Sequence, residues 1–142
     1  MLTLSFIFML GFVACTGNAQ NNHQSSVQDK NIIQVIDFHS TKRCLTCNAI
    51  EKQSRETIEK NFKDELLDGT IIFKTVNIDE DANAQLAEEF EASGTSLFIN
   101  ILVDGQSEKV DLTQFAFMNA RNDEVKFEKG LVSELEKALK KL

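Results

Sequence analysis

Short apolar runs alternate along the chain with segments in which apolar residues recur every three or four positions. The runs at residues 32–38 and 97–103 are rich in β-branched residues, which is typical of strands buried in a sheet. Residues 70–78 are expected to form a further strand. Asp37 is the only charged residue of the first run, which makes it the anomaly of that strand.

Helical spacing follows the first strand and returns at the end of the chain. After the first strand, one apolar stripe predicts a helix that ends at Asp68-Gly69, and its members are Cys47, Ile50, Ser54, Ile58, Phe62 and Leu66. A second stripe predicts a final helix and consists of Phe127, Leu131, Leu135, Ala138 or Leu139, and Leu142. Asn122 and Asp123 are possible caps of that helix, and Asp81 is expected to cap a short element after the second strand.

A hairpin signal completes the pattern. Asp104-Gly105 is typical of a two-residue turn and leads from the third strand into residues 109–112. The order strand, helix, strand, helix, strand, strand, helix predicts a mixed α/β fold with an antiparallel edge. No element is assigned between the hairpin and the last helix. There we expect Phe115, Phe117 and Met118 to pack in the core, the alternative being an apolar docking surface.

The beginning of the chain differs in composition from the rest. Residues 1–14 form an apolar run that is too short to span a bilayer and is typical of a secretory signal. Val13-Ala14-Cys15 resembles the lipobox of bacterial lipoproteins, whose cysteine is lipidated. Residues 15–30 are polar and are expected to form a flexible tether, which leaves a domain at 31–142. We expect this domain in the periplasm or cell envelope, attached to the membrane through Cys15.

The net charge and the length of the chain limit the partners and the number of domains that it can be expected to have. The chain has 142 residues and a formal net charge of −7, and no acidic or basic residue precedes Asp29. This acidic balance argues against nucleic acid as a partner. The charged part of the chain is about the size of one ordinary domain. We therefore expect one monomeric domain.

Two cysteines separated by two residues stand where the first strand gives way to the first helix. The backbone N–H groups of a helix's first turn favour a thiolate, which is the nucleophilic form of cysteine, and Cys44 lies in that position. Arg43 should lower the pKa of Cys44 further if its side chain stays near the sulfur. Cys44 would then attack a partner disulfide and Cys47 would resolve the mixed disulfide. A purely structural disulfide is the alternative.

Asp37 and His39 are the candidates for proton transfer beside the cysteines. A buried carboxylate at position 37 could take or return the proton of Cys47. His39 could tune the thiolate or relay protons. The alternatives are that Asp37 satisfies a hydrogen bond at the strand end, and that His39 is a hydrogen-bonded or solvated residue there.

These features resemble the thioredoxin superfamily over residues 31–142. The resemblance is carried by the strand ending at Asp37-Phe38, the motif Cys44-Leu45-Thr46-Cys47, the strand end Val76-Asn77-Ile78-Asp79, the stretch from Phe90 to Gly94, and the hairpin at Asp104-Gly105. The run from Phe38 to Cys47 also resembles a lipoprotein group of Bacteroides-type bacteria named as a nitrophenyl compound nitroreductase subunit, ArsF. The resemblance implies a three-layer α/β/α domain with a mixed sheet of about four strands. Nothing in the sequence indicates a flavin or nicotinamide site, so no cofactor is expected.

The chain departs from the family's pattern around the motif. Arg43 and Leu45-Thr46 stand where family members usually carry Trp and Gly-Pro. The family's cis-proline aligns with Ser96, and a cis bond after Thr95 would cost on the order of 3 kcal/mol, so a trans bond is expected. The resemblance makes Thr95, Ser96 and Leu45 the positions that contact substrate. Without the proline screen, two thiolates could also hold zinc or copper(I).

The sequence as a whole predicts an exported, membrane-tethered thiol–disulfide oxidoreductase. Its substrates would be protein disulfides or the dithiols of a redox partner, and it would need no cofactor and no metal. Two alternatives stay open. One is a metal-binding or metallochaperone module that uses Cys44 and Cys47, and the other is a thioredoxin-like interaction domain without catalysis.

Overall fold

A four-stranded mixed sheet forms the centre of the computed structural model, which describes residues 31–142. The strands are β1 (Ile32–His39), β2 (Ile71–Asn77), β3 (Ser96–Val103) and β4 (Gln106–Asp111). Their order in the sheet is β2-β1-β3-β4. β1 pairs with β2 in parallel and with β3 antiparallel, and β3 and β4 are antiparallel. The predicted α/β class with an antiparallel edge is therefore confirmed.

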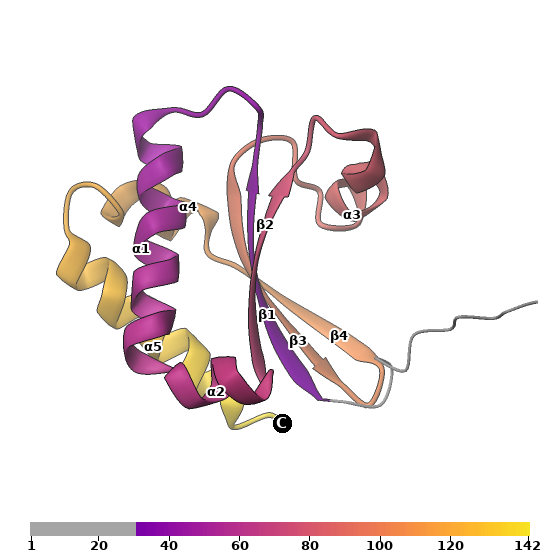
Figure 1. Cartoon of the computed structure of the whole chain (residues 1–142), viewed down its shortest axis with the longest axis vertical. Helices are drawn as coiled ribbons and strands as arrows, with labels where there is room; N and C mark the ends of the chain where they lie inside the picture. The colour runs from indigo at the N-terminus through magenta and orange to yellow at the C-terminus, as the bar shows by residue number, and fades with distance from the viewer. Residues whose placement is uncertain (1–30) are drawn as a thin grey trace, which may run out of the picture.

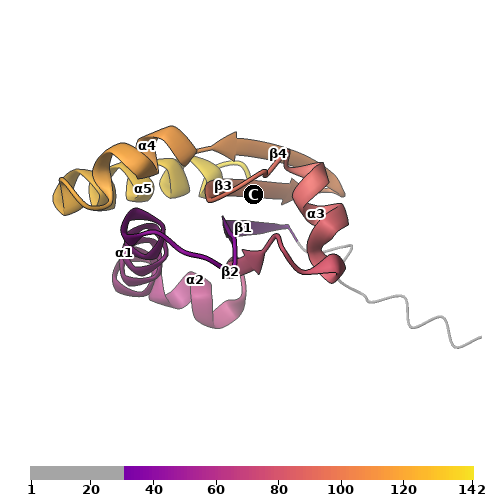
Figure 2. The same ribbon diagram turned by 90° about the horizontal axis from the view of Figure 1, so that it is seen from above.

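Helices cover both faces of this sheet (Figure 1). The helices are α1 (Leu45–Asn61), α2 (Lys63–Asp68), α3 (Ala84–Glu89), α4 (Thr113–Asn119) and α5 (Glu124–Leu139), and a short 3₁₀ turn, η1 (Asp81–Asn83), precedes α3. Seen from above in Figure 2, α1, α4 and α5 lie on one side of the strands and α3 on the other. This arrangement has three layers, with the sheet in the middle.

Successive side chains of β1 point alternately to the two faces of the sheet and pack into an apolar cluster on each face. Ile33 and Val35 point into the larger apolar cluster, which includes Ile50 of α1. Ile36 and Phe38 point to the other face and pack with the α3 side of the molecule. Because both faces are covered, most positions of the strand are apolar, and the polar residues within it are Gln34, Asp37 and the terminal His39.

The first helix is shorter than its apolar stripe predicts. Phe62 has φ −134° and ψ 40°, which is not helical, and this residue separates α1 from α2. The Phe62 side chain is still buried, so the stripe remains apolar although the helix is interrupted. Gly69 ends α2 in the left-handed conformation, as predicted for Asp68-Gly69. The prediction that Asp81 caps a helix is wrong, because Asp81 lies within η1 and α3 follows Asn83.

The turn between β3 and β4 has the geometry that its sequence predicts. Asp104 has φ 50° and Gly105 has φ 76°. Left-handed conformations at both central positions define the type I′ turn, which matches the twist of paired strands. The last predicted helix is likewise present, and Asp123 caps it by accepting a hydrogen bond from the backbone N–H of Lys126 at 2.9 Å.

The segment before α5, for which the sequence pattern predicts no element, forms α4. Its Phe115 ring stacks on Phe127 with centroids 5.7 Å apart and lies against Gly130, where an added Cβ would overlap the ring. Phe117 and Met118 are 41% and 60% exposed. The prediction that they pack in the core is therefore wrong, because α4 turns Ala116 and Asn119 toward the core and leaves these two side chains on its outer sides.

The predictions for the signal at 1–14, for Cys15 and for the tether at 15–30 lie outside the described residues. Between residues 31 and 142, no helix is long and apolar enough to cross a membrane.

Candidate functional site

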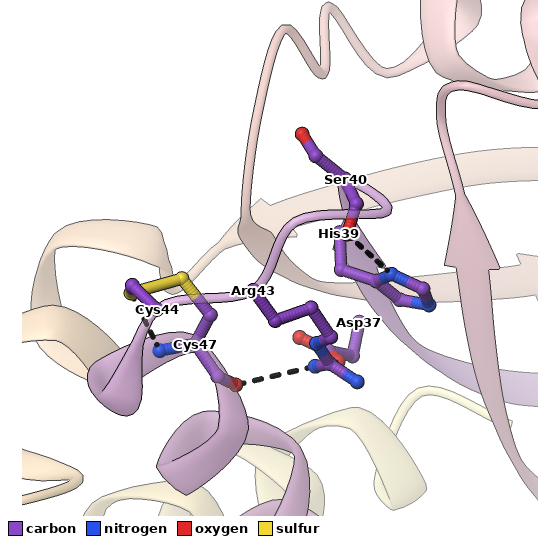
Figure 3. The surroundings of a disulfide bond; sticks show 6 residues. All are labelled: Asp37, His39, Ser40, Arg43, Cys44 and Cys47. Carbon is purple, nitrogen blue, oxygen red and sulfur yellow. Dashed lines mark hydrogen bonds and ion pairs between the residues drawn. A yellow bond between two sulfur atoms is a disulfide. The ribbon is translucent and has the colours of Figure 1, made fainter.

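Cys44 is the N-cap of α1, as the strand-to-helix junction predicts. Its backbone is extended, with φ −80° and ψ 166°, and its Sγ accepts a hydrogen bond from the backbone N–H of Cys47 at 3.0 Å. The two cysteines form a disulfide with their Cα atoms 5.0 Å apart. Cys44 is exposed, whereas Cys47 is only 7% exposed. The first residue of the pair is thus open to solvent and the second is buried, and Figure 3 shows the disulfide between them at the start of α1.

The loop that carries Cys44 is tied to the end of β2. The backbone N–H of Thr41 donates to Oδ2 of Asp79 at 2.7 Å, and Nδ2 of Asn77 donates to Oγ1 of Thr41 at 3.1 Å. The backbone N–H of Ile78 donates to the carbonyl oxygen of His39 at 2.8 Å. The hydrogen bond from Thr41 holds the pKa of Asp79 below its usual value. Residues far apart in the sequence therefore fix the start of α1.

Asp37 lies beneath this helix start. It shares its face of β1 with Ile33 and Val35, and it is 0% exposed. Oδ2 of Asp37 accepts a hydrogen bond from Nη2 of Arg43 at 3.0 Å, while Oδ1 has no hydrogen-bond partner among the described residues. Burial raises the pKa of Asp37 to about 7, although the positive charge of Arg43 opposes the rise. A group with this pKa can exchange a proton near neutral pH.

Arg43 links Asp37 to the helix. Its Nη2 also donates to the backbone carbonyl of Cys47 at 3.2 Å, and its Nη1 donates to Oε2 of Glu51. In Figure 3 the guanidinium is directed toward Asp37 and the Cys47 carbonyl. Within residues 31–142 its hydrogen bonds go to these oxygens, and none goes to a sulfur atom. Its predicted action on the Cys44 thiolate stays a prediction.

Glu51 and Arg55 belong to the same network and were missed by the sequence analysis. Nη2 of Arg55 donates to Oε1 of Glu51 at 3.1 Å. Burial favours the neutral form of Glu51, but hydrogen bonds from Arg43 and Arg55 outweigh it and lower the pKa of Glu51. The signal that could have found Glu51 is its spacing, because it lies one helical turn after Cys47 and one before Arg55.

His39 ends β1 and is half-buried. Its Nδ1 lies 3.1 Å from the carbonyl oxygen of Ser40. In Figure 3 the ring lies on the other side of Arg43 from the disulfide. This placement matches the interpretation of a hydrogen-bonded residue at a strand end, and a role in proton transfer stays a prediction.

The predicted substrate positions lie at the same end of the sheet as the cysteines. Ser96 begins β3 and stands opposite Phe38 in the register, and both Thr95 and Ser96 are half-buried. The described residues have no cis peptide bond, so the bond between Thr95 and Ser96 is trans, as predicted. Leu45 is 74% exposed directly after Cys44. These side chains are therefore available to a partner, and their role in binding stays a prediction.

Across residues 31–142, no group of three or more His, Cys, Asp or Glu side chains is arranged to hold a metal ion. Cys44 and Cys47 by themselves offer two sulfur ligands.

Comparison with known proteins adds little to this geometry. No protein-family model matches the chain, and no curated protein matches it. One similar solved structure is described as the structure of a malarial protein. It is 18% identical, with a TM-score of 0.40, and the match covers 62% of this chain and 94% of that one.

Proposed function

We propose that the protein is a thioredoxin-like thiol–disulfide oxidoreductase that is exported and tethered to the membrane through Cys15. The observation that carries the proposal is the unequal exposure of the two cysteines at the start of α1. Cys44 is exposed and Cys47 is buried, and Arg43 links the buried Asp37 carboxylate to the backbone carbonyl of Cys47. A structural disulfide has no need of this asymmetry, whereas an exchange reaction requires one sulfur that a partner can reach.

The reaction can be written from the reduced form. The Cys44 thiolate attacks one sulfur of a substrate disulfide, which breaks that bond, forms a mixed disulfide and releases one substrate thiolate. Cys47 then loses its proton and attacks Sγ of Cys44, which forms the Cys44–Cys47 disulfide and releases the second substrate thiolate. The two thiolates take up two protons. The substrate gains two electrons and the cysteine pair loses them, and the reverse sequence oxidises a dithiol.

Asp37 is proposed to accept the proton of Cys47. Nη2 of Arg43 donates both to Oδ2 of Asp37 and to the backbone carbonyl of Cys47, so one guanidinium nitrogen joins the carboxylate to the residue that carries the resolving thiol. Oδ1 of Asp37 has no protein partner among residues 31–142 and can receive a proton without breaking a hydrogen bond. Because the pKa of Asp37 is raised to about 7, its carboxylate is a stronger base than an ordinary one.

The substrate is proposed to be the disulfide or dithiol of another protein. Cys44 stands at an open surface beside the exposed Leu45, with the Thr95–Ser96 backbone at the same end of the sheet. An extended segment of a partner protein could lie across these residues while its cysteine meets Cys44.

Variants of the two cysteines test this mechanism. Cys47→Ser should accumulate a mixed disulfide between Cys44 and a reporter protein, because the resolving thiol is missing. Cys44→Ser should abolish exchange, and Cys15→Ser should leave it unchanged in detergent. Exchange that continues at the normal rate in Cys44→Ser would refute the proposed function.

A metal-binding module is the second candidate, because the two sulfurs lie side by side at one helix start. Thiolates are soft ligands that suit copper(I) and zinc, and a pair of chains could share the ion. Equilibrium dialysis of the reduced protein distinguishes the two candidates. Tight binding that is lost in the double Cys44→Ser, Cys47→Ser variant, together with absent exchange, would favour the metal module.

A further inference from the structure

A chain of charged side chains runs from Asp37 to the surface of α1. The exposed fraction of the side chain rises along it, from 0% at Asp37 through 19% at Arg43 and 26% at Glu51 to 47% at Arg55. Arg43 uses different nitrogens for the two carboxylates, Nη2 for Asp37 and Nη1 for Glu51. One guanidinium is thus shared between a fully buried acid and a half-buried one.

The contact between Arg43 and Asp37 is modest by itself. It is one hydrogen bond of 3.0 Å, and neither Nε of Arg43 nor Oδ1 of Asp37 has a partner among the described residues. Arginine often binds a carboxylate through two parallel N–H···O hydrogen bonds, and this contact has only one. Arg43 also sits in the loop next to the exposed Cys44, where a long side chain has solvent within reach. The same nitrogen adds only one longer bond, of 3.2 Å to the Cys47 carbonyl, so a further contact is needed to keep the guanidinium inward.

We infer that Glu51 is a positioning residue that holds Arg43 between Asp37 and the Cys47 carbonyl, and so keeps a positive charge on the buried acid. Glu51 is suited to this task because Arg55 fixes its other oxygen at 3.1 Å. The inference rests on the proposed function, in which Asp37 takes the proton of Cys47. If Glu51 has this role, a residue near the surface of α1 determines the pH range in which Asp37 can accept the proton of Cys47.

The direction in which the pKa of Asp37 moves when Glu51 is removed distinguishes two roles of Glu51, which are positioning Arg43 and acting on Asp37 through its own charge. The charged groups that act on Asp37 are Arg43 from the loop and Glu51 and Arg55 from α1, and its sheet neighbours Thr75 and Leu97 are uncharged. The negative charge of Glu51 raises the pKa of Asp37, and the positive charge of Arg43 lowers it. If Glu51 acts only through its charge, removing it lowers the pKa of Asp37. If it positions Arg43, removing it raises that pKa.

The titration of Asp37 can be observed directly in the full-length oxidised protein. Isotope-labelled aspartate gives a carboxyl NMR signal whose shift follows ionisation, and Asp37→Asn identifies which signal belongs to Asp37. Glu51→Ala removes both the charge and the anchor, and Glu51→Gln removes the charge but keeps an oxygen within reach of Arg43. The matched control is Glu56→Ala, because Glu56 is an exposed residue of α1 that pairs with Lys52.

If Glu51 positions Arg43, the titration midpoint of Asp37 should rise by about one pH unit in Glu51→Ala. This is the lower end of the pKa shift that the loss of a neighbouring opposite charge produces. The midpoint should stay at or below the normal one in Glu51→Gln and should not move in Glu56→Ala. In an Arg43→Gln background, Glu51→Ala should give no rise. A midpoint that falls or stays in Glu51→Ala overturns the inference. If that variant does not fold, Glu51→Asp, which keeps the charge and shortens the reach, must raise the midpoint instead.

The titration needs no exchange activity, so it tests the inference separately from the proposed function. The pH dependence of disulfide exchange in the same variants then tests the link between the two. If the Asp37 midpoint rises and the exchange profile does not follow, Glu51 positions Arg43, and the proton role of Asp37 is refuted.

Discussion

Replacing Asp37 by Asn should change how the stability of the protein depends on pH. Asp37 is fully buried, and burial raises its pKa to about 7 from the ordinary value of 3.8. Between these values the folded state binds a proton that the unfolded state has lost. The free energy of unfolding therefore falls as pH rises through this window, and it levels off above the folded pKa. Asn does not titrate, so the variant lacks this slope.

The size of the effect follows from the difference in pKa. Each pKa unit corresponds to about 1.4 kcal/mol, and because the folded group is half titrated at pH 7, the step from pH 5 to 7 should cost the natural protein about 2 kcal/mol relative to the variant. Glu51, Asp79 and Glu128 have lowered pKa values, and their contributions are lost only at lower pH. Measurements from pH 5 upward therefore isolate Asp37.

Urea unfolding of the oxidised protein measures this difference. The chain contains no Trp and no Tyr, so far-UV circular dichroism is the suitable signal. The amide side chain of the Asp37→Asn variant would still offer an oxygen to Arg43, and any constant loss from the substitution cancels when only the change with pH is compared. A difference between the two proteins that stays flat from pH 5 to 8 would refute the reasoning that Asp37 is buried with a raised pKa.

Two further predictions concern the supports of the site. Gly130→Ala should destabilise the protein by about 1–3 kcal/mol, because the new methyl group overlaps the Phe115 ring, and the loss in urea unfolding should shrink in a Phe115→Ala background; an equal loss in both would contradict this packing. Asp79→Ala should loosen the loop before α1, because it removes the acceptor of the Thr41 N–H. Amide hydrogen exchange at Thr41 should then accelerate, while exchange in β1 should stay slow.

The strands, the turn and the helix start that position the cysteines could be predicted from the pattern of apolar and polar residues. β1 and β3 could be predicted because strands buried on both faces are rich in apolar, β-branched residues, and the I′ turn because Asp-Gly tolerates left-handed backbone. Cys44 could be placed at the start of α1 because the apolar period changes from strand-like to helical just beyond it.

The direction of the Arg43 side chain could not be predicted in the same way. Its position next to Cys44 suggested an effect on the thiolate, which stays a prediction, whereas the contacts with Asp37 and Glu51 arise because the fold brings both carboxylates within reach of the guanidinium. The exposure of Phe117 and Met118 was missed for a similar reason. Whether an apolar side chain is buried depends on which side of its helix faces the core, and α4 turns Ala116 and Asn119 toward it.

If Cys44 and Cys47 form a redox couple, as proposed, their reduction potential can be measured. The purified Cys15→Ser protein is equilibrated with glutathione buffers, and the free thiols are trapped and counted. We expect a reversible transition of two thiols per chain, with a potential between those of thioredoxin, about −270 mV, and a strong oxidant, about −120 mV. If the pair shows no reversible transition in this range, Cys44 and Cys47 do not exchange disulfides as proposed.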